Sequence, residues 1–165
     1  MSDNLRNLLQ PYIGIQSNGW GHFDCSDFVR HVYKNLTGNS RSIYKQVDPI
    51  NNKADLKPGD LVFLKGTNSN ISPKLVSHVA IVTNTDRIGE GIIQIAQGSP
   101  NKITGLREWN LNDKYFDTHW VGGGRLKTPS AKLGMKFQNG GYFIGNLPEF
   151  IKPIKKPFQL PYIEI

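Results

Sequence analysis

The sequence lacks the features that would place it in several common classes of protein. It contains one cysteine in 165 residues, so it cannot form an intramolecular disulfide or a cysteine-based zinc site. No apolar run approaches the roughly 20 residues that span a bilayer, which excludes membrane insertion. No RNA-recognition motif and no zinc-finger spacing is present, which argues against nucleic acid as a partner.

The composition is that of one ordinary globular domain with a basic surface. Apolar residues make up 38% of the chain and charged residues 20%, which is enough to bury a core. The formal net charge of +7 favours an acidic partner, such as anionic lipid or an anionic wall polymer. The first residues, MSDNLRNLLQPYIG, include an early acidic residue and no apolar stretch of Sec type. The sequence therefore predicts synthesis in the cytoplasm without a Sec signal.

The single cysteine, Cys25, opens a segment with the periodicity of an amphipathic helix. Its apolar positions form one helix face: Cys25, Phe28, Val29, Val32, Tyr33 and Leu36. Asp24 is suited to cap the first turn, Asp27 can complete a capping box, and Gly38 stands where the helix should end. Cys25 is thus predicted at the positive end of a helix, where a thiolate is favoured.

The remaining segments predict a short helix, loops and strands. A helix is expected over residues 4–9 and a loop over 14–22. Apolar, β-branched runs bounded by turn residues predict four strands, at 61–65, 77–84, 91–98 and 118–126. Strands that follow a helix in this way predict an α+β domain, with an antiparallel sheet packed on the cysteine helix. Prolines and lysines mark residues 129–165 as an extension, so the main domain would span 1–128.

A nucleophilic thiol needs a base, and the chain offers four histidines. His22 lies in the loop just upstream of the cysteine. His31 falls six residues beyond it, roughly on the opposite helix face, and is predicted to be exposed to solvent. His119 would line the last strand. His78 opens a predicted strand, a rigid position from which a base can face a helix terminus, and is therefore the favoured base.

Three segments in this order resemble the NlpC/P60 cysteine peptidases, a papain-like family that cleaves peptidoglycan stem peptides. They are FDCSDFV at 23–29, LKPGDLVFLK at 56–65 and SHVAIV at 77–82. The likeness extends over about residues 5–126. It implies a papain-like NlpC/P60 fold, in which the nucleophile helix packs on a central antiparallel β-sheet, and it makes 1–128 the catalytic domain.

The resemblance also implies roles for individual residues. Cys25 would be the nucleophile and His78 the general base, which later acts as acid toward the leaving amine. The backbone N–H of Cys25 would help to hold the oxyanion. Asp24 and Ser26 match positions that contact the free amino end of a stem peptide. The resemblance implies no metal and no cofactor.

This sequence departs from the family pattern at the third catalytic position. That member is a polar residue, often histidine, on the strand after the base, and here the strand reads IIQIAQGS. Gln97 shares a face with Ile95, which occupies the expected position, and its amide can accept from an imidazole N–H. Gln94 points to the other face. The alternatives of Gln97, Gln94 or no third member therefore stay open, with Gln97 favoured. Asp27 also departs, since the family commonly has glycine there.

The resemblance implies a peptidoglycan hydrolase that cleaves a stem-peptide amide through a thiol acyl-enzyme, and the bond we expect it to cleave is the D-glutamyl-meso-diaminopimelate bond. The small basic body without a Sec signal resembles the amidase effectors of type VI secretion systems. This implies export by a dedicated system to the periplasm or cell wall of a target cell, and an immunity protein as inhibitor. Phage release through a holin and cytosolic recycling of wall fragments are the other routes by which a protein without a Sec signal would meet this substrate. The protein is expected to be a monomer. The alternatives are a CHAP-like wall amidase, a phage lysin, or a papain-like acyltransferase that acts on lipid. Known acyltransferase relatives place the histidine before the cysteine, which is the reverse of the order here.

Overall fold

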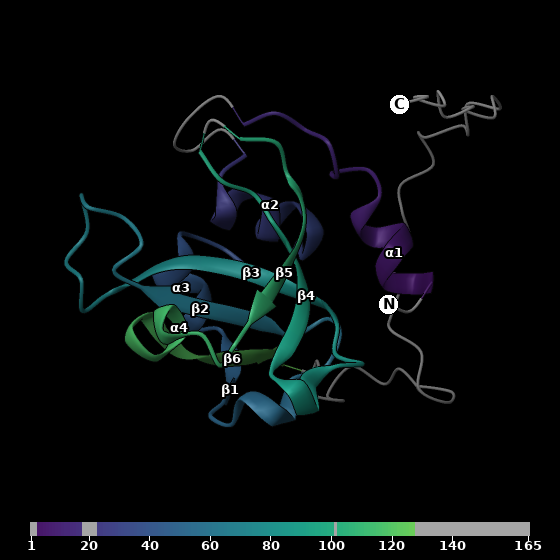
Figure 1. The fold of residues 1–165 in the computed structure, drawn as a ribbon. Coiled ribbons are helices and arrows are strands. Elements are labelled where there is room, and N and C mark those ends of the chain that lie inside the picture. Colours follow the sequence, from purple (N-terminus) through teal and green to yellow (C-terminus); the bar gives the residue numbers. More distant parts are fainter. Residues whose placement is uncertain (1–2, 18–22, 101, 128–165) are drawn as a thin grey trace, which may run out of the picture. The chain divides into compact units, whose positions relative to one another are not determined.

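A computed structural model describes residues 3–17, 23–100 and 102–127 (Figure 1). The predicted extension over 129–165 and the loop residue His22 lie outside the described residues. No helix in the described ranges is long and apolar enough to cross a bilayer. The helices of this part are α1 (Asp3–Leu9), α2 (Cys25–Val32), α3 (Ser40–Tyr44) and α4 (Lys114–His119), with short 3-10 turns at Lys53–Asp55 and Ile88–Glu90.

A six-stranded sheet forms the centre of this domain. Its strands in chain order are β1 (Val47–Ile50), β2 (Leu61–Lys65), β3 (Val76–Asn84), β4 (Ile92–Gln97), β5 (Gly105–Asn110) and β6 (Trp120–Leu126). Across the sheet they follow the order β1-β6-β2-β3-β4-β5, and all neighbours pair antiparallel. The predicted α+β class with an antiparallel sheet is confirmed.

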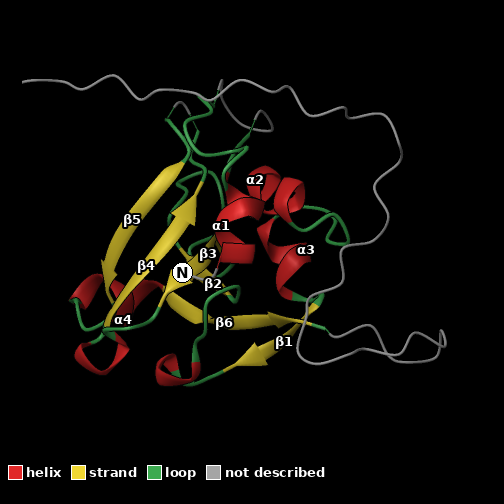
Figure 2. Ribbon diagram, turned by 90° about the vertical axis from the view of Figure 1, so that its right-hand side faces the viewer, coloured by secondary structure: helices red, strands yellow, loops and turns green. Residues whose placement is uncertain are grey.

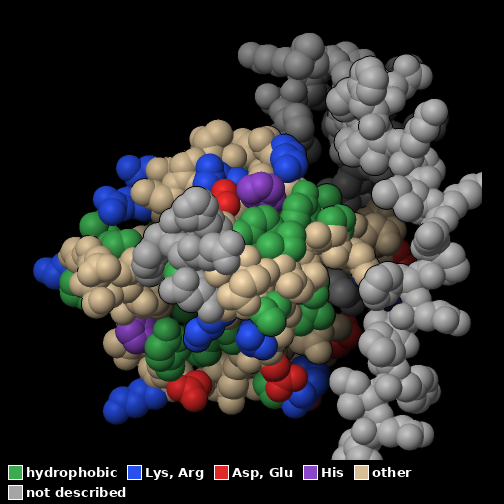
Figure 3. All heavy atoms as spheres, turned by 90° about the horizontal axis from the view of Figure 1, so that it is seen from above, with side chains coloured by type: hydrophobic (Ala, Val, Ile, Leu, Met, Phe, Trp, Pro, Cys, Tyr) green, Lys and Arg blue, Asp and Glu red, His purple; other side chains and the backbone are tan. Residues whose placement is uncertain are grey.

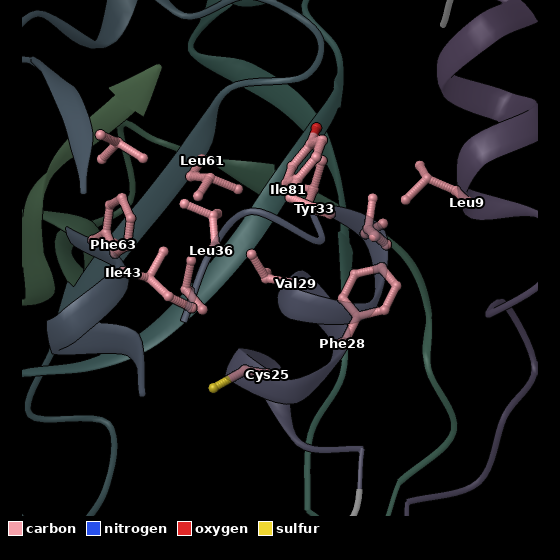
Figure 4. Close-up of a cluster of buried hydrophobic side chains, with 14 of the residues drawn as sticks. Leu9, Cys25, Phe28, Val29, Tyr33, Leu36, Ile43, Leu61, Phe63 and Ile81 are labelled. Atoms are coloured by element: carbon pink, nitrogen blue, oxygen red, sulfur yellow. The ribbon is translucent and has the colours of Figure 1, made fainter. Parts of the chain in front are cut away.

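Each face of the sheet carries its own hydrophobic core, because side chains alternate along a strand. Helices α2 and α3 lie together on one face (Figure 2), where Phe28 of α2 and Val79 of β3 belong to one buried cluster. Figure 4 shows Cys25 at the edge of this cluster, with its sulfur pointing away from Phe28. The other face buries Ile95 of β4 with Phe116 of α4. The cysteine helix is therefore fixed on the sheet by its apolar face.

The turn before β2 anchors the middle of the sheet. Gly59 has a φ of 96°, in the left-handed region that glycine adopts without strain. Asp60 is buried, and its Oδ2 accepts the Lys57 backbone N–H at 2.7 Å. Its two oxygens also accept from Nε and Nη2 of Arg125 on β6, at 2.8 and 2.7 Å. One carboxylate thus joins the turn to a neighbouring strand.

Helix α2 ends earlier than the sequence predicts. The apolar pattern continues to Leu36, but the helix ends at Val32. Tyr33 leaves the helical conformation, with φ −110° and ψ 85°, and its hydroxyl donates to the Gly59 carbonyl at 2.9 Å. Tyr33 and Leu36 stay buried all the same. The apolar periodicity of the sequence therefore indicated correctly which residues are buried, but it continued past the end of the helix.

Four elements were not predicted, namely α3, β1, β5 and α4. The strand β5 leaves most of its side chains exposed, and β1 is four residues long and contains Pro49, so neither shows an apolar strand pattern. The expectation that His119 lines the last strand is wrong. It is the last residue of α4, and its Nδ1 lies 2.8 Å from the carbonyl oxygen of Lys65.

Candidate active site

The first turn of α2 is held by Asp24, as the sequence predicts. Asp24 is the N-cap in an extended conformation, and its Oδ1 accepts the backbone N–H groups of Ser26 and Asp27 at 2.9 and 3.0 Å. The hydroxyl of Ser26 donates to the same oxygen at 2.9 Å. Cys25 is the first helical residue. The cap therefore fixes the backbone on both sides of the thiol.

Asp27 does not complete the predicted capping box in its usual form. Its Oδ2 accepts the N–H of Phe23 at 2.9 Å, one residue upstream of the N-cap N–H that a capping box would satisfy. Phe23, whose N–H makes this bond, has a φ of 67°. Asp27 therefore joins the residue before the cap to the first turn of α2.

The Cys25 thiol lies against the strand that carries His78. Its side chain is buried, with 4% of the residue exposed, and the backbone N–H of Val79, the residue after His78, lowers the pKa of the thiol. The backbone N–H groups of Ser26 and of Cys25 itself act in the same direction. These donors occupy the position where negative charge on sulfur would be stabilised.

Burial nevertheless raises the pKa of the Cys25 thiol to about 11, and the Asp24 carboxylate acts in the same direction. The three backbone N–H donors lower it, but by less. The expectation of a thiolate at the helix end is therefore wrong for the resting site. Loss of hydration outweighs the donors, and the thiol is protonated at neutral pH.

His78 lies near the start of β3 and bonds directly to Gln97 of β4. The distance from His78 Nε2 to Gln97 Oε1 is 2.8 Å. An amide oxygen only accepts, so Nε2 carries the proton and donates, and Nδ1 is left as the acceptor of the neutral ring. Burial lowers the pKa of His78, while the bond to Gln97 and the charge of Asp24 raise it. The ring is therefore a neutral base at pH 7.

The structure separates the two glutamines between which the sequence left a choice. Gln97 is partly buried and accepts from His78, whereas Gln94 is exposed and pairs in register with Asn84 and Glu108. Gln97 thus has the geometry of an orienting residue. No hydrogen bond joins the Cys25 thiol to the His78 ring within the described ranges. Val79, the residue after His78, lowers the pKa of Cys25 through its backbone N–H. The charge of Asp24 raises the pKa of both Cys25 and His78.

The other described histidines serve different contacts. His31 has 42% of its side chain exposed, which agrees with the predicted exposure in part, and its Nδ1 lies 2.8 Å from the Asp27 carbonyl. His119 contacts the carbonyl of Lys65. In the part of the chain that the structure describes, no group of three or more acidic, cysteine and histidine side chains could hold a metal ion.

Two neighbours of the site could not be found by pattern alone. Trp109, on the unpredicted strand β5, places its ring centroid 6.1 Å from that of His78. Gly98 follows Gln97 and approaches the backbone before the cysteine so closely that an added Cβ would lie 2.9 Å from the Phe23 carbonyl oxygen and 2.8 Å from that of Asp24. In the sequence, the only indication of this close approach is the glycine of AQGS, which has no Cβ to obstruct it.

On one face of the described domain the basic side chains do not form a single patch. On the face seen in Figure 3, lysine and arginine side chains stand in several separate groups among apolar and uncharged atoms.

Asp24 and Ser26, the predicted contacts of a substrate amine, are both buried and hydrogen-bonded to each other. Their part in binding a stem peptide stays a prediction.

The comparisons with known proteins agree with one another. Residues 11–125 match the model of the NlpC/P60 family. The chain is 29% identical over 138 residues to the murein DD-endopeptidase MepH of Escherichia coli, a match that covers 79% of this chain and 46% of that protein. The chain thus spans just under half the length of this curated relative.

Solved structures show the same fold. A protein of Staphylococcus aureus, described as similar to a lipoprotein of the NLP/P60 family, superposes with a TM-score of 0.58 at 20% identity, over 78% of this chain and 43% of that one. NlpC2 of Trichomonas vaginalis gives a TM-score of 0.54 at 21% identity, over 76% of this chain and 46% of that one. At these identities the likeness concerns the fold alone.

Proposed function

This chain belongs to the NlpC/P60 family, and from that premise we propose that it is a peptidoglycan hydrolase that cleaves a stem-peptide amide with Cys25 as nucleophile. The observation that carries the proposal is the pairing of Gln97 with His78, one residue before Val79, whose backbone N–H lowers the pKa of the thiol. A nucleophile, a base and a residue that orients the base are the three parts that thiol acyl transfer needs.

The reaction begins from a neutral thiol and a neutral imidazole. His78 Nδ1 takes the thiol proton as the sulfur of Cys25 attacks the amide carbonyl. The new oxyanion is held by the backbone N–H of Cys25, where one donor is worth roughly 3 kcal/mol of barrier. The C–N bond then breaks, and the imidazolium gives its proton to the leaving amine. His78 then takes a proton from a water molecule as the water oxygen attacks the thioester carbonyl. The C–S bond breaks to release the carboxylic acid, and the imidazolium returns the proton to the thiolate of Cys25.

Gln97 supports this cycle by fixing one tautomer of His78. Its amide oxygen holds the proton on Nε2, so that Nδ1 is always the accepting nitrogen. It also favours the charged ring, since the same bond raises the pKa of His78. The glutamine thereby takes the place that a histidine often fills in this family.

The bond we propose is that between D-glutamate and meso-diaminopimelate. The relative from E. coli is a murein DD-endopeptidase, which makes the D,D cross-link the alternative bond. Digestion of purified muropeptides, followed by mass spectrometry, distinguishes the two. Cleavage at D-glutamate leaves a dipeptide on the muramyl sugar, whereas cleavage of the cross-link converts dimers to monomers with intact stems.

The matched control is the same protein after alkylation with iodoacetamide, which blocks the one cysteine. Dipeptide products from untreated protein alone would support the proposal, and monomers with intact stems would move the assignment to the cross-link. Unchanged muropeptides would overturn it. Delivery by a dedicated export system and inhibition by an immunity protein stay predictions from the sequence.

A further inference from the structure

The backbone turns sharply two residues before the nucleophile. Phe23 has a φ of 67°, and it is the only non-glycine residue with positive φ among those that the structure describes. Aromatic residues seldom adopt this region, and they keep it only when surrounding contacts hold them there. The direction in which the chain enters α2, and so the position of Cys25, depends on whatever holds Phe23.

Contacts of three kinds hold Phe23. Its ring lies among aromatic neighbours, with centroids 5.9 Å from Tyr12, 6.1 Å from Phe28 and 5.0 Å from His31. Its carbonyl faces Gly98 at a distance that leaves no room for a Cβ. Its N–H donates to Asp27 Oδ2 at 2.9 Å. Of these contacts, the hydrogen bond to Asp27 is the one that joins the Phe23 backbone to a side chain of α2, so it directly restrains the φ angle of Phe23.

We propose that Asp27 is a positioning residue for Cys25. Its carboxylate holds Phe23 in the left-handed conformation, and this presses the Phe23 and Asp24 carbonyls against Gly98, the residue after Gln97. The nucleophile and the strand that orients the base are thereby held in one arrangement. The inference rests on the proposed role of Cys25.

The simpler account is that Asp27 stabilises helix α2 and nothing more. Its Oδ1 forms an ion pair with Arg30 at 2.9 Å and lies 3.6 Å from His31 Nδ1. An acidic residue in the first turn also interacts favourably with the helix dipole. The two accounts differ in which carboxylate oxygen matters, because Oδ2 serves Phe23 and Oδ1 serves Arg30.

Three variants separate these accounts. Asp27→Ala removes both contacts, Asp27→Asn keeps an oxygen that can accept from Phe23, and Arg30→Gln breaks the ion pair alone. For each variant we would measure the pH dependence of Cys25 alkylation by iodoacetamide, kcat and KM on muropeptides, and the thermal midpoint. Alkylation reads the environment of the thiol whether or not muropeptides are the substrate, so the failure of this inference and the failure of the proposed function give different results.

In Asp27→Ala, kcat should fall about tenfold to a hundredfold with little change in KM, the effect of displacing a reacting group by a fraction of its contact distance. The alkylation midpoint should move down from the wild-type value, which burial sets near 11, because the released turn exposes the thiol. Asp27→Asn should restore both readouts to near wild type, and Arg30→Gln should leave both unchanged.

Equal losses in Arg30→Gln and Asp27→Ala would overturn the inference, since the ion pair would then explain the effect. A wild-type kcat and alkylation midpoint in Asp27→Ala would overturn it as well. Should that variant not fold, Gly98→Ala decides the matter, because its methyl group presses on the same two carbonyls. An unchanged alkylation midpoint in Gly98→Ala would contradict the inference.

Discussion

Replacement of Gln97 by leucine tests the orienting bond of the site. Leucine has nearly the same size as glutamine but no acceptor, so the 2.8 Å bond from His78 Nε2 is lost with little change in packing. Two effects follow. The imidazole loses the partner that fixes its tautomer, and the charged ring that forms during attack loses its hydrogen bond.

The size of the loss follows from the charge on the ring. A hydrogen bond to a charged group contributes roughly 1.5–3 kcal/mol, which corresponds to a decrease in kcat of about 10- to 150-fold. The bond to Gln97 also raises the pKa of His78, so its removal should lower that pKa further. Because His78 must be neutral to act as base, the acidic limb of kcat/KM should shift to lower pH in Gln97→Leu.

The assay is the initial rate of muropeptide cleavage between pH 4 and 9, together with the thermal midpoint of each protein. Gln94→Ala is the matched control, since it changes the same residue type on the same strand and leaves His78 untouched. Gln97→Glu should keep an acceptor and move the acidic limb upward, because a carboxylate favours the charged ring. A wild-type rate and pH profile in Gln97→Leu, or an equal loss of rate in Gln94→Ala, would show that Gln97 does not orient His78.

The remaining predictions concern stability. The pKa of the Cys25 thiol is about 9 in an unfolded chain and is raised to about 11 in the fold, so its contribution is complete below pH 9 and is lost as the pH rises to 11. Denaturation should then show that the wild type loses about 2 kcal/mol more than Cys25→Ala between pH 8 and 11, and equal losses would contradict this. Gly124→Ala places a Cβ against Val47 and should lower the free energy of unfolding by about 2 kcal/mol; an unchanged urea midpoint would show that the strand can yield. Asp60→Asn weakens the pairing with Arg125 and should cost about 2 kcal/mol without lowering the specific activity of the folded protein, which a combined urea titration and rate assay would check.

The central elements of the fold were predictable because their side chains are buried on one or both faces. The apolar runs of β2 and β3 and the capped start of α2 appear at the predicted places. The strand β5 was not predicted, because most of its side chains face solvent and no apolar alternation is needed there. Its stability comes from pairing with β4, which a local pattern does not report.

In the candidate site, too, some features could be predicted from the sequence and others could not. Cys25, His78 and Gln97 could be singled out by residue type, position and resemblance, and the structure joins the last two by a hydrogen bond. The protonation state of the resting thiol could not be predicted from the sequence, because the cost of burying the sulfur depends on the whole packed environment. The conformation of Phe23 was equally hidden, since it depends on a side chain four residues later.

The most direct test of the account is muropeptide digestion by the wild type and by Cys25→Ala, with products identified by mass spectrometry and folding checked by the thermal midpoint. If Cys25 is the nucleophile, the wild type should release stem-peptide fragments, and the folded variant should release them at a rate lower by about a thousandfold or more, as for the loss of other catalytic nucleophiles. The same fragments, released by Cys25→Ala at the wild-type rate, would contradict the claim that this thiol is the nucleophile.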